Sequence, residues 1–261
     1  MHPSLRRFLP NPSQADDWDQ RLIYELDPVV PQYWERIDDT VTARLAELGH
    51  KVKSPFSSAL HGVGPEAEIG AGKWGYVYKL NQTTAGPRWA LKLTEDPTEG
   101  PIAAFIMGNP LLHRMEGCVD FAGVWQLPER STHGNIIYVI VREFLESTSI
   151  SHISAHLLSE VRKPAAVYNQ GGSWDDMDAA RQRTMELLLE LAAYAPRAKA
   201  VVDFMVEYYR ETGWFLADLH AANLGERQRS NMWVAFDVGH SNIDDAPAID
   251  YLPNPGPPVL S

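Results

Sequence analysis

The chain has 261 residues, and its 23 Lys and Arg against 34 Asp and Glu give a net charge of −11. This acidity argues against general affinity for nucleic acid, because binding an extended phosphate backbone needs an excess of basic side chains. The single cysteine, Cys118, excludes an internal disulfide, and the sequence has neither a secretory signal nor a run of about eighteen apolar residues that would span a membrane. A cytoplasmic protein without membrane contact is therefore the simplest expectation.

Residues 1–60 are predicted to form a helical N-terminal extension. Apolar side chains recur there at spacings of three and four, which places them on one helix face: Trp34, Ile37, Val41, Leu45 and Leu48. Gly49 follows as the expected C-terminal cap. The pattern favours a helix that packs against the rest of the protein, and nothing in it indicates a regulatory or substrate-binding role.

A glycine-rich stretch lies in a predicted β-hairpin. Strand-like residues lead to Gly70 and Gly72, and after Lys73 and Gly75 a second strand with Val77 follows. Glycines allow the backbone to approach phosphate groups closely. A helix follows the last glycine in dinucleotide-binding folds, whereas a strand follows here, so we predict a hairpin loop that covers the phosphates of a nucleotide. Taken alone, the stretch is equally compatible with an ordinary glycine-rich turn.

A third strand, residues 88–93, carries the candidate phosphate-binding lysine. The alternation of side chains puts Lys92 on one face and its two leucine neighbours on the other. Ala90 shares the face of Lys92, where a small side chain leaves room for an adenine ring. A lysine on a sheet is usually a solvated edge charge, but the position of Lys92 one strand after the glycine hairpin favours a role at the phosphates.

A helix is predicted to begin at Thr98, and it offers a carboxylate partner for the lysine. A lysine that grips phosphates needs a carboxylate to hold its ammonium, and Glu99 is the candidate. Glu116 is the alternative. Glu99 is also compatible with a plain first-turn acid that the helix dipole favours.

Two further strands, residues 121–127 and 135–141, complete a predicted five-stranded sheet. Residues 142–146 follow as a predicted hinge, in which backbone groups of Glu143 and Leu145 pair with the adenine edge. Helices are then predicted over residues 151–212, interrupted by a loop at 169–172 and ended by Gly213.

The remaining candidate residues lie between residues 214 and 239. A short apolar strand, 214–216, leads to Asp218, and Asn223 follows five residues later; a hairpin then ends at Asp237. Asp218 can accept or orient the proton of an acceptor hydroxyl, whereas Asn223 and Asp237 offer the oxygen ligands that Mg²⁺ prefers. Each aspartate alone is compatible with an acidic turn, but their order and spacing together favour chemistry.

In their order, these motifs resemble the protein-kinase-like superfamily, which includes protein kinases and the aminoglycoside and choline phosphotransferases. The resemblance covers residues 66–239. It implies a bilobal α+β fold, with a five-stranded antiparallel N-lobe in residues 61–145 and a reduced helical C-lobe in residues 146–261. It also implies that ATP and Mg²⁺ are the cofactors, with the roles given above for the lysine, the two aspartates and the asparagine. The glycine-rich loop of the family corresponds to Gly70, Gly72 and Gly75.

The chain also departs from the family pattern. Leu216 and Ala217 replace the His-Arg pair that precedes the catalytic aspartate of protein kinases, so activation by loop phosphorylation is not expected. His220 stands where serine/threonine kinases carry lysine, as it does in the small-molecule phosphotransferases. Only 22 residues (240–261) follow Gly239, and five of them are prolines, so the peptide-binding helices of protein kinases are missing.

The sequence thus indicates an atypical, truncated phosphotransferase that moves the γ-phosphate of ATP to a hydroxyl group of a protein or a small molecule. Two alternatives stay open at this point. One is a nucleotide-binding pseudokinase or scaffold, which the missing substrate-binding segment would suit. The other is transfer of a nucleotidyl group on the same fold.

Overall fold

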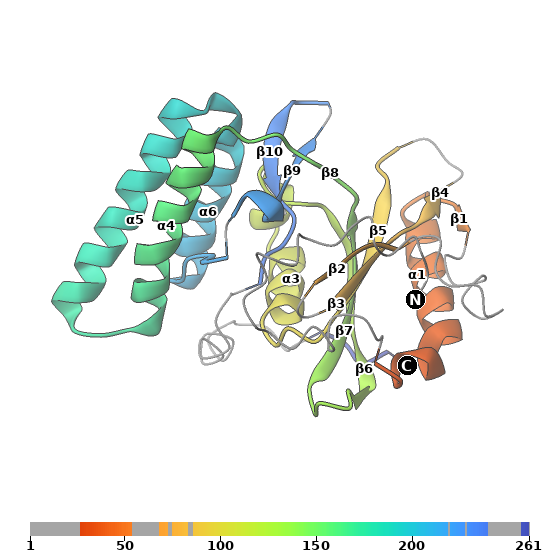
Figure 1. Ribbon diagram of the computed structural model, residues 1–261. Coiled ribbons are helices and arrows are strands. Elements are labelled where there is room, and N and C mark those ends of the chain that lie inside the picture. Colours follow the sequence, from red (N-terminus) through yellow and green to blue (C-terminus); the bar gives the residue numbers. More distant parts are fainter. Residues whose placement is uncertain are drawn as a thin grey trace, which may run out of the picture.

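A five-stranded antiparallel sheet forms the middle of this α+β protein, with a helix on each face and three longer helices to one side (Figure 1). The computed structural model describes residues 27–53, 68–72, 75–82, 86–218, 220–227, 229–239 and 257–260. Within these residues, no helix has the length and apolar character needed to cross a bilayer.

The sheet confirms the five predicted strands. Its order is β2-β3-β5-β7-β6, and every neighbouring pair is antiparallel. The bounds are Glu68–Gly72 for β2, Gly75–Lys79 for β3, Trp89–Thr94 for β5, Phe121–Arg130 for β6 and Ile136–Glu143 for β7. Two short strands, β1 (Val52–Lys53) and β4 (Asn81–Gln82), form a separate pair.

Helix α1 (Trp34–Glu47) covers one face of the sheet, after a 3₁₀ turn, η3 (Val30–Tyr33). Its buried side chains Ile37, Val41 and Leu45 pack in one cluster with Leu91 and Leu93 of β5. This confirms the predicted apolar helix face. Leu48 was assigned to that face wrongly: it follows the last helical residue and is 43% exposed. Gly49 ends the helix in a left-handed conformation, with φ of 82°.

Helix α3 (Glu99–Gly108) covers the opposite face, followed by a short 3₁₀ turn, η4 (Leu112–Arg114). Thr98 is the N-cap residue as predicted, but the side chain that caps the helix is Asp96. One carboxylate oxygen of Asp96 accepts hydrogen bonds from the amide and hydroxyl of Thr98 and from the amide of Glu99. Asp96 therefore fixes the start of α3 and with it the position of Glu99.

Helices α4 (His152–Gln170), α5 (Trp174–Tyr194) and α6 (Lys199–Thr212) lie together beside the sheet (Figure 1). A 3₁₀ turn, η5 (Pro196–Ala198), precedes α6. Ser173 caps α5 by accepting a hydrogen bond from the amide of Asp176. Gly213 ends α6 with φ of 76°, as predicted. The helices and the sheet meet in one apolar cluster that includes Phe105, Phe204 and Phe215.

The predicted strand at residues 214–216 is wrong, because this segment has no strand partner in the described part of the chain. The buried amide side chain of Asn169 takes the place of a partner strand. Its Nδ2 donates to the carbonyl of Phe215 at 2.7 Å, and its Oδ1 accepts from the amide of Phe215 at 3.1 Å. An amide side chain offers one donor and one acceptor, so it can satisfy a buried backbone as a neighbouring strand would.

A second sheet of three strands lies between the helices and the large sheet (Figure 1). It consists of β8 (Glu146–Ser147), β9 (Leu224–Arg227) and β10 (Met232–Ala235), in the order β10-β9-β8. The predicted hinge at residues 142–146 is therefore too long, because Arg142 and Glu143 still belong to β7 and Glu146 already belongs to β8. Only Phe144 and Leu145 connect the two strands.

The described C-terminal residues 257–260 lie against the edge of the large sheet. The amide of Gln126 donates to the carbonyl of Pro258 at 3.0 Å, and the amide of Leu260 donates to the carbonyl of Gln126 at 2.8 Å. Leu260 is 1% exposed and joins the apolar cluster beneath α1, whereas its neighbour Val259 is 51% exposed. This segment therefore covers part of the edge of β6 and adds one apolar side chain to the core.

We expect Leu260→Ala to lower the free energy of unfolding by about 2–3 kcal/mol, because it leaves a cavity in the cluster beneath α1. Urea denaturation of the full chain measures the change. Val259→Ala is the matched control and should change the free energy by less than about 0.5 kcal/mol. Equal effects of the two substitutions would contradict the docking of Leu260.

Candidate active site

Lys92 lies at the centre of the candidate site. It projects from β5 toward α3, and its Nζ lies 2.7 Å from Oε1 of Glu99 and 2.8 Å from Oδ2 of Asp237. The ion pair expected between Lys92 and Glu99 is therefore present. Glu116, the alternative partner, lies elsewhere and uses its backbone carbonyl to accept a hydrogen bond from Arg227.

The charges around Lys92 are strongly coupled, because one ammonium serves two buried carboxylates. Burial alone would lower the pKa of Lys92, but the charges of Asp237 and Glu99 outweigh it and raise the pKa above its ordinary value. Burial would also raise the pKa of Asp237, yet the charge of Lys92 and its hydrogen bond lower it to about 2. The pKa of Glu99 is raised, first by burial and then by the charge of Asp237. Lys92 and Asp237 are thus the firmly ionised pair, and Glu99 is the weaker acid.

The loop of Asp218 is held by Asn223, at the end of a 3₁₀ turn, η6 (Ala221–Asn223). Nδ2 of Asn223 donates to the backbone carbonyl of Asp218 at 2.8 Å and to its Oδ2 at 3.3 Å. The carbonyl of Asn223 accepts a hydrogen bond from the amide of Phe236 at 3.1 Å. This bond fastens the Asp218 loop to the residue before Asp237, so the two candidate metal ligands are on joined segments.

Two side chains approach the carboxylate of Asp218. Nη2 of Arg162, from α4, lies 3.2 Å from Oδ1, and Nε2 of His220 lies 3.7 Å from the same oxygen. Burial raises the pKa of Asp218, while the charges of His220 and Arg162 act to lower it and the charge of Asp237 acts to raise it.

The residues proposed for the metal suit Mg²⁺. Asn223 and Asp237 carry an amide oxygen and a carboxylate oxygen, the hard ligands that Mg²⁺ selects, and Mg²⁺ needs only one or two protein ligands when phosphate and water supply the rest. Their segments are joined by the hydrogen bond between the amide of Phe236 and the carbonyl of Asn223. The chemistry of the two donors therefore fits the expected ion.

The glycine hairpin has the predicted form, and one glycine has a clear packing role. Gly70 pairs with Val77 and Gly72 with Gly75 between β2 and β3. A Cβ on Gly75 would lie 1.8 Å from the carbonyl oxygen of Leu93, so close packing against β5 requires glycine there. Val77 is opposite Lys92 and thus on its face. Lys73 lies outside the described residues.

The residues proposed for adenine binding are partly used within the fold. The amide of Glu143 donates to the carbonyl of Asp120 at 2.7 Å, and its carboxylate binds Arg227. Leu145 packs over Gly225, where an added Cβ would lie 2.5 Å from the Cβ of the leucine. Ala90 is fully buried in β5. The role of these residues at a base stays a prediction.

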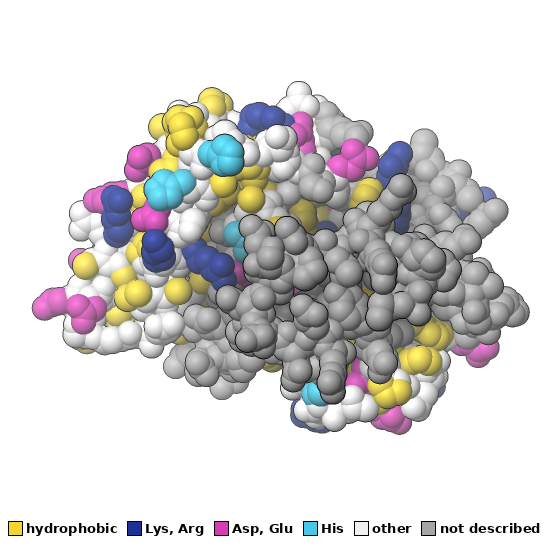
Figure 2. Space-filling view, in the orientation of Figure 1, with side chains coloured by type: hydrophobic (Ala, Val, Ile, Leu, Met, Phe, Trp, Pro, Cys, Tyr) yellow, Lys and Arg dark blue, Asp and Glu magenta, His cyan; other side chains and the backbone are white. Residues whose placement is uncertain are grey.

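Sequence reasoning missed three arginines: Arg142, Arg162 and Arg227. Each of them contacts residues that are far away in the chain. The spacing of residues in the sequence therefore does not predict these contacts. One signal was present for Arg142, which is a charged residue within the apolar run of β7. Figure 2 shows His, Lys and Arg side chains interspersed with Asp and Glu side chains over α4 and α5. Four basic residues of α4 are exposed: His152, His156, Arg162 and Lys163.

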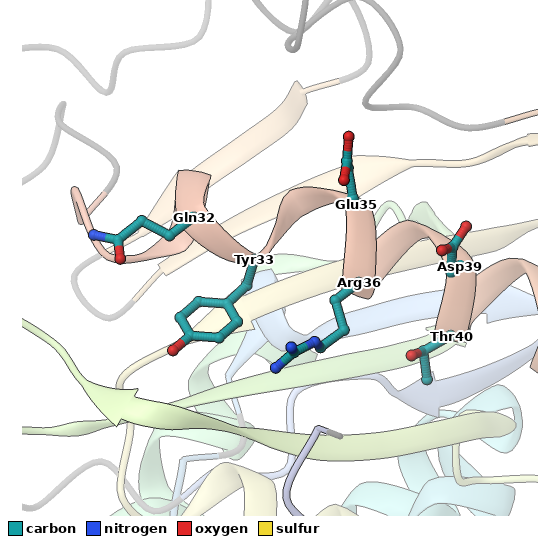
Figure 3. A pocket seen from close by; sticks show the side chains of 6 residues that line it. All are labelled: Gln32, Tyr33, Glu35, Arg36, Asp39 and Thr40. Atoms are coloured by element: carbon teal, nitrogen blue, oxygen red, sulfur yellow. The ribbon is translucent and has the colours of Figure 1, made fainter.

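Two other features lie away from Lys92. A surface hollow of about 450 Å³ runs along α1, with Tyr33 and Arg36 on one side of the helix and Glu35 and Asp39 pointing elsewhere (Figure 3). Because α1 packs on the face of β5 opposite to Lys92, the sheet separates this hollow from the candidate site. A polar cluster of Asp27, Glu95 and His133 lies near the β6–β7 turn, where Thr132 donates two hydrogen bonds to Asp27.

The chain matches no protein-family model and no curated protein. Charged groups meet at Lys92 from β5, α3 and the segment after β10, and the hydrogen bond between the amide of Phe236 and the carbonyl of Asn223 joins the Asp218 loop to that segment.

Proposed function

We propose that the protein is a protein-kinase-like phosphotransferase that moves the γ-phosphate of ATP to a hydroxyl group of a protein or small molecule. One observation carries the proposal: Nζ of Lys92 lies within 2.8 Å of both Glu99, on the helix that follows its strand, and Asp237, 145 residues further along the chain. A lysine held by a helical glutamate next to a metal-binding aspartate is the arrangement that phosphoryl transfer by this superfamily requires.

The architecture supports the proposal as well. An antiparallel sheet of five strands begins with a glycine-rich hairpin, and the helix that follows the lysine strand supplies the glutamate. The Asp218 loop and the β9–β10 hairpin come after the helices, in the order the resemblance implies. In this proposal residues 61–145 form the nucleotide-binding lobe, and residues 146–261 form a reduced helical lobe with the acceptor side of the site.

Each residue then has a distinct task. Lys92 has three N–H donors, so it can keep Glu99 as a partner while it binds oxygens of the α- and β-phosphates. Asp218 orients the acceptor hydroxyl and takes its proton as the hydroxyl oxygen bonds to the γ-phosphorus and the bond to the β–γ bridging oxygen breaks, which releases ADP. Mg²⁺ on Asn223 and Asp237 would supply charge neutralisation at the phosphate oxygens.

The proposal is tested by incubating the full chain with ATP and Mg²⁺ in the presence of cell extract, with label at either the γ- or the α-phosphate. We expect transfer of γ label that is lost in both Asp218→Asn and Asp237→Asn. Transfer of α label would instead identify a nucleotidyltransferase. Nucleotide binding without any transfer would identify a pseudokinase.

The pH dependence of transfer tests the contact between Arg162 and Asp218. The positive charge of Arg162 acts to lower the pKa of Asp218, and the ionised carboxylate is the form that takes a proton. Without Arg162 the pKa of Asp218 rises, so in Arg162→Gln the acidic limb of the rate profile should move to higher pH. Arg183→Gln, which removes an exposed partner of Glu186 on α5, is the control and should leave the limb in place. An unmoved limb in Arg162→Gln would contradict the role of Asp218 as the titrating group.

A further inference from the structure

Arg142 is a buried cation without a hydrogen-bonding partner. The residue is 6% exposed, its Nε is buried and unsatisfied, and no hydrogen bond or ion pair joins its guanidinium to the described residues. Its Cζ lies 4.7 Å from the ring of Phe236, and the charges of Asp237 and Glu99 act on it, but neither the ring contact nor a hydrogen bond to these carboxylates uses its N–H donors. By contrast Arg227, 4% exposed, donates to a carboxylate and two carbonyls. Buried N–H donors are normally hydrogen-bonded, so the unused donors of Arg142 indicate a ligand.

The strand register places Arg142 at the base end of the proposed nucleotide site. Arg142 pairs with Ala90 across β5 and β7, and Lys92 pairs with Ile140. Cross-strand partners share a face of the sheet, so Arg142 lies on the face of Lys92. It is two residues, or about 7 Å, further toward the linker of Phe144 and Leu145. Since Lys92 marks the phosphates, Arg142 is beyond them, where the base would lie.

We propose that Arg142 recognises the base of the donor nucleotide and selects a 6-oxopurine, so that GTP binds more tightly than ATP. The inference rests on the proposed function, because it assumes that a nucleotide binds beside Lys92. A guanidinium offers donors only. Guanine presents two acceptors, O6 and N7, on the edge that arginine matches with two hydrogen bonds, whereas adenine presents an amino group in place of O6. The amino group of adenine would face the N–H donors of Arg142, so these donors would stay without an acceptor.

Calorimetric titration of the full chain with the Mg²⁺ complexes of GTP, ITP and ATP tests the proposal. ITP carries the 6-oxo group without the amino group of guanine, so it isolates the contact with Arg142. We expect GTP and ITP to bind about tenfold more tightly than ATP. Arg142→Met should abolish that preference. Arg130→Met is the control, because Arg130 is exposed on the neighbouring strand β6, and it should keep the preference.

The outcomes separate the inference from the proposed function. Binding of ATP as tightly as GTP and ITP would overturn the inference alone, as would a preference that Arg142→Met retains. Failure of all three nucleotides to bind would overturn the proposed function and the inference with it. If Arg142→Met does not fold, the order of the three affinities in the unaltered protein still decides the question.

Discussion

We expect Asp218→Asn to lower γ-phosphate transfer by about 10²- to 10⁴-fold, the usual contribution of a positioned proton acceptor. The amide has the shape of the carboxylate but cannot accept the acceptor's proton. The nucleotide affinity should change little, because Lys92, Glu99 and Asp237 keep their contacts. Rates from γ-labelled substrate and affinities from calorimetry measure the two effects separately.

A matched substitution on the surface shows whether the loss of phosphate transfer is specific to the position of Asp218. Asp203→Asn makes the same chemical change on the exposed surface of α6, where Asp203 pairs with Lys199, and transfer should be unchanged. The thermal unfolding midpoint of Asp218→Asn should also stay close to that of the unaltered chain. Full transfer activity in Asp218→Asn would remove Asp218 from the reaction, and an equal loss of nucleotide affinity would indicate a binding role instead.

The parts of the fold that follow from local pattern were predictable. Short runs rich in β-branched and aromatic residues identified the five strands, and spacings of three and four identified the buried face of α1. The ion pair between Lys92 and Glu99 was also predictable, because a strand and the helix after it are close in sequence. The positions of Lys92 and Glu99 are set by a strand and a helix that can each be predicted from the local sequence.

The errors came from interactions that no local pattern contains. Residues 214–216 are apolar and strand-like, but the amide of Asn169, from α4, satisfies their backbone and no strand pairs with them. Arg142 and Arg162 gain their importance only where β7 and α4 meet segments far along the chain. A sequence shows the type of these residues, whereas tertiary packing determines their neighbours.

The buried contacts of Arg227 indicate that its loss should destabilise the protein strongly. Arg227 projects from β9, and its Nη2 lies 2.6 Å from a carboxylate oxygen of Glu143 in β7, so it connects the small sheet to the large one. It also donates to the carbonyls of Glu116 at 3.0 Å and Cys118 at 3.2 Å. Arg227 and Glu143 are 4% and 7% exposed. We expect Arg227→Met to lower the free energy of unfolding by about 3–5 kcal/mol, because it leaves a buried carboxylate without its partner.

A double variant tests whether the unpaired charge of Glu143 causes the loss of stability in Arg227→Met. Removing both charges, in Arg227→Met with Glu143→Leu, should recover part of the stability, because no isolated charge then remains in the core. Recovery should be incomplete, since the carbonyls of Glu116 and Cys118 still lack the donors that Arg227 supplied. Urea denaturation measures all three proteins. Arg210→Met, which breaks an exposed pair with Glu207 on α6, is the control and should change the free energy by less than about 0.5 kcal/mol. A double variant less stable than Arg227→Met would show that the unpaired charge of Glu143 is not the cause.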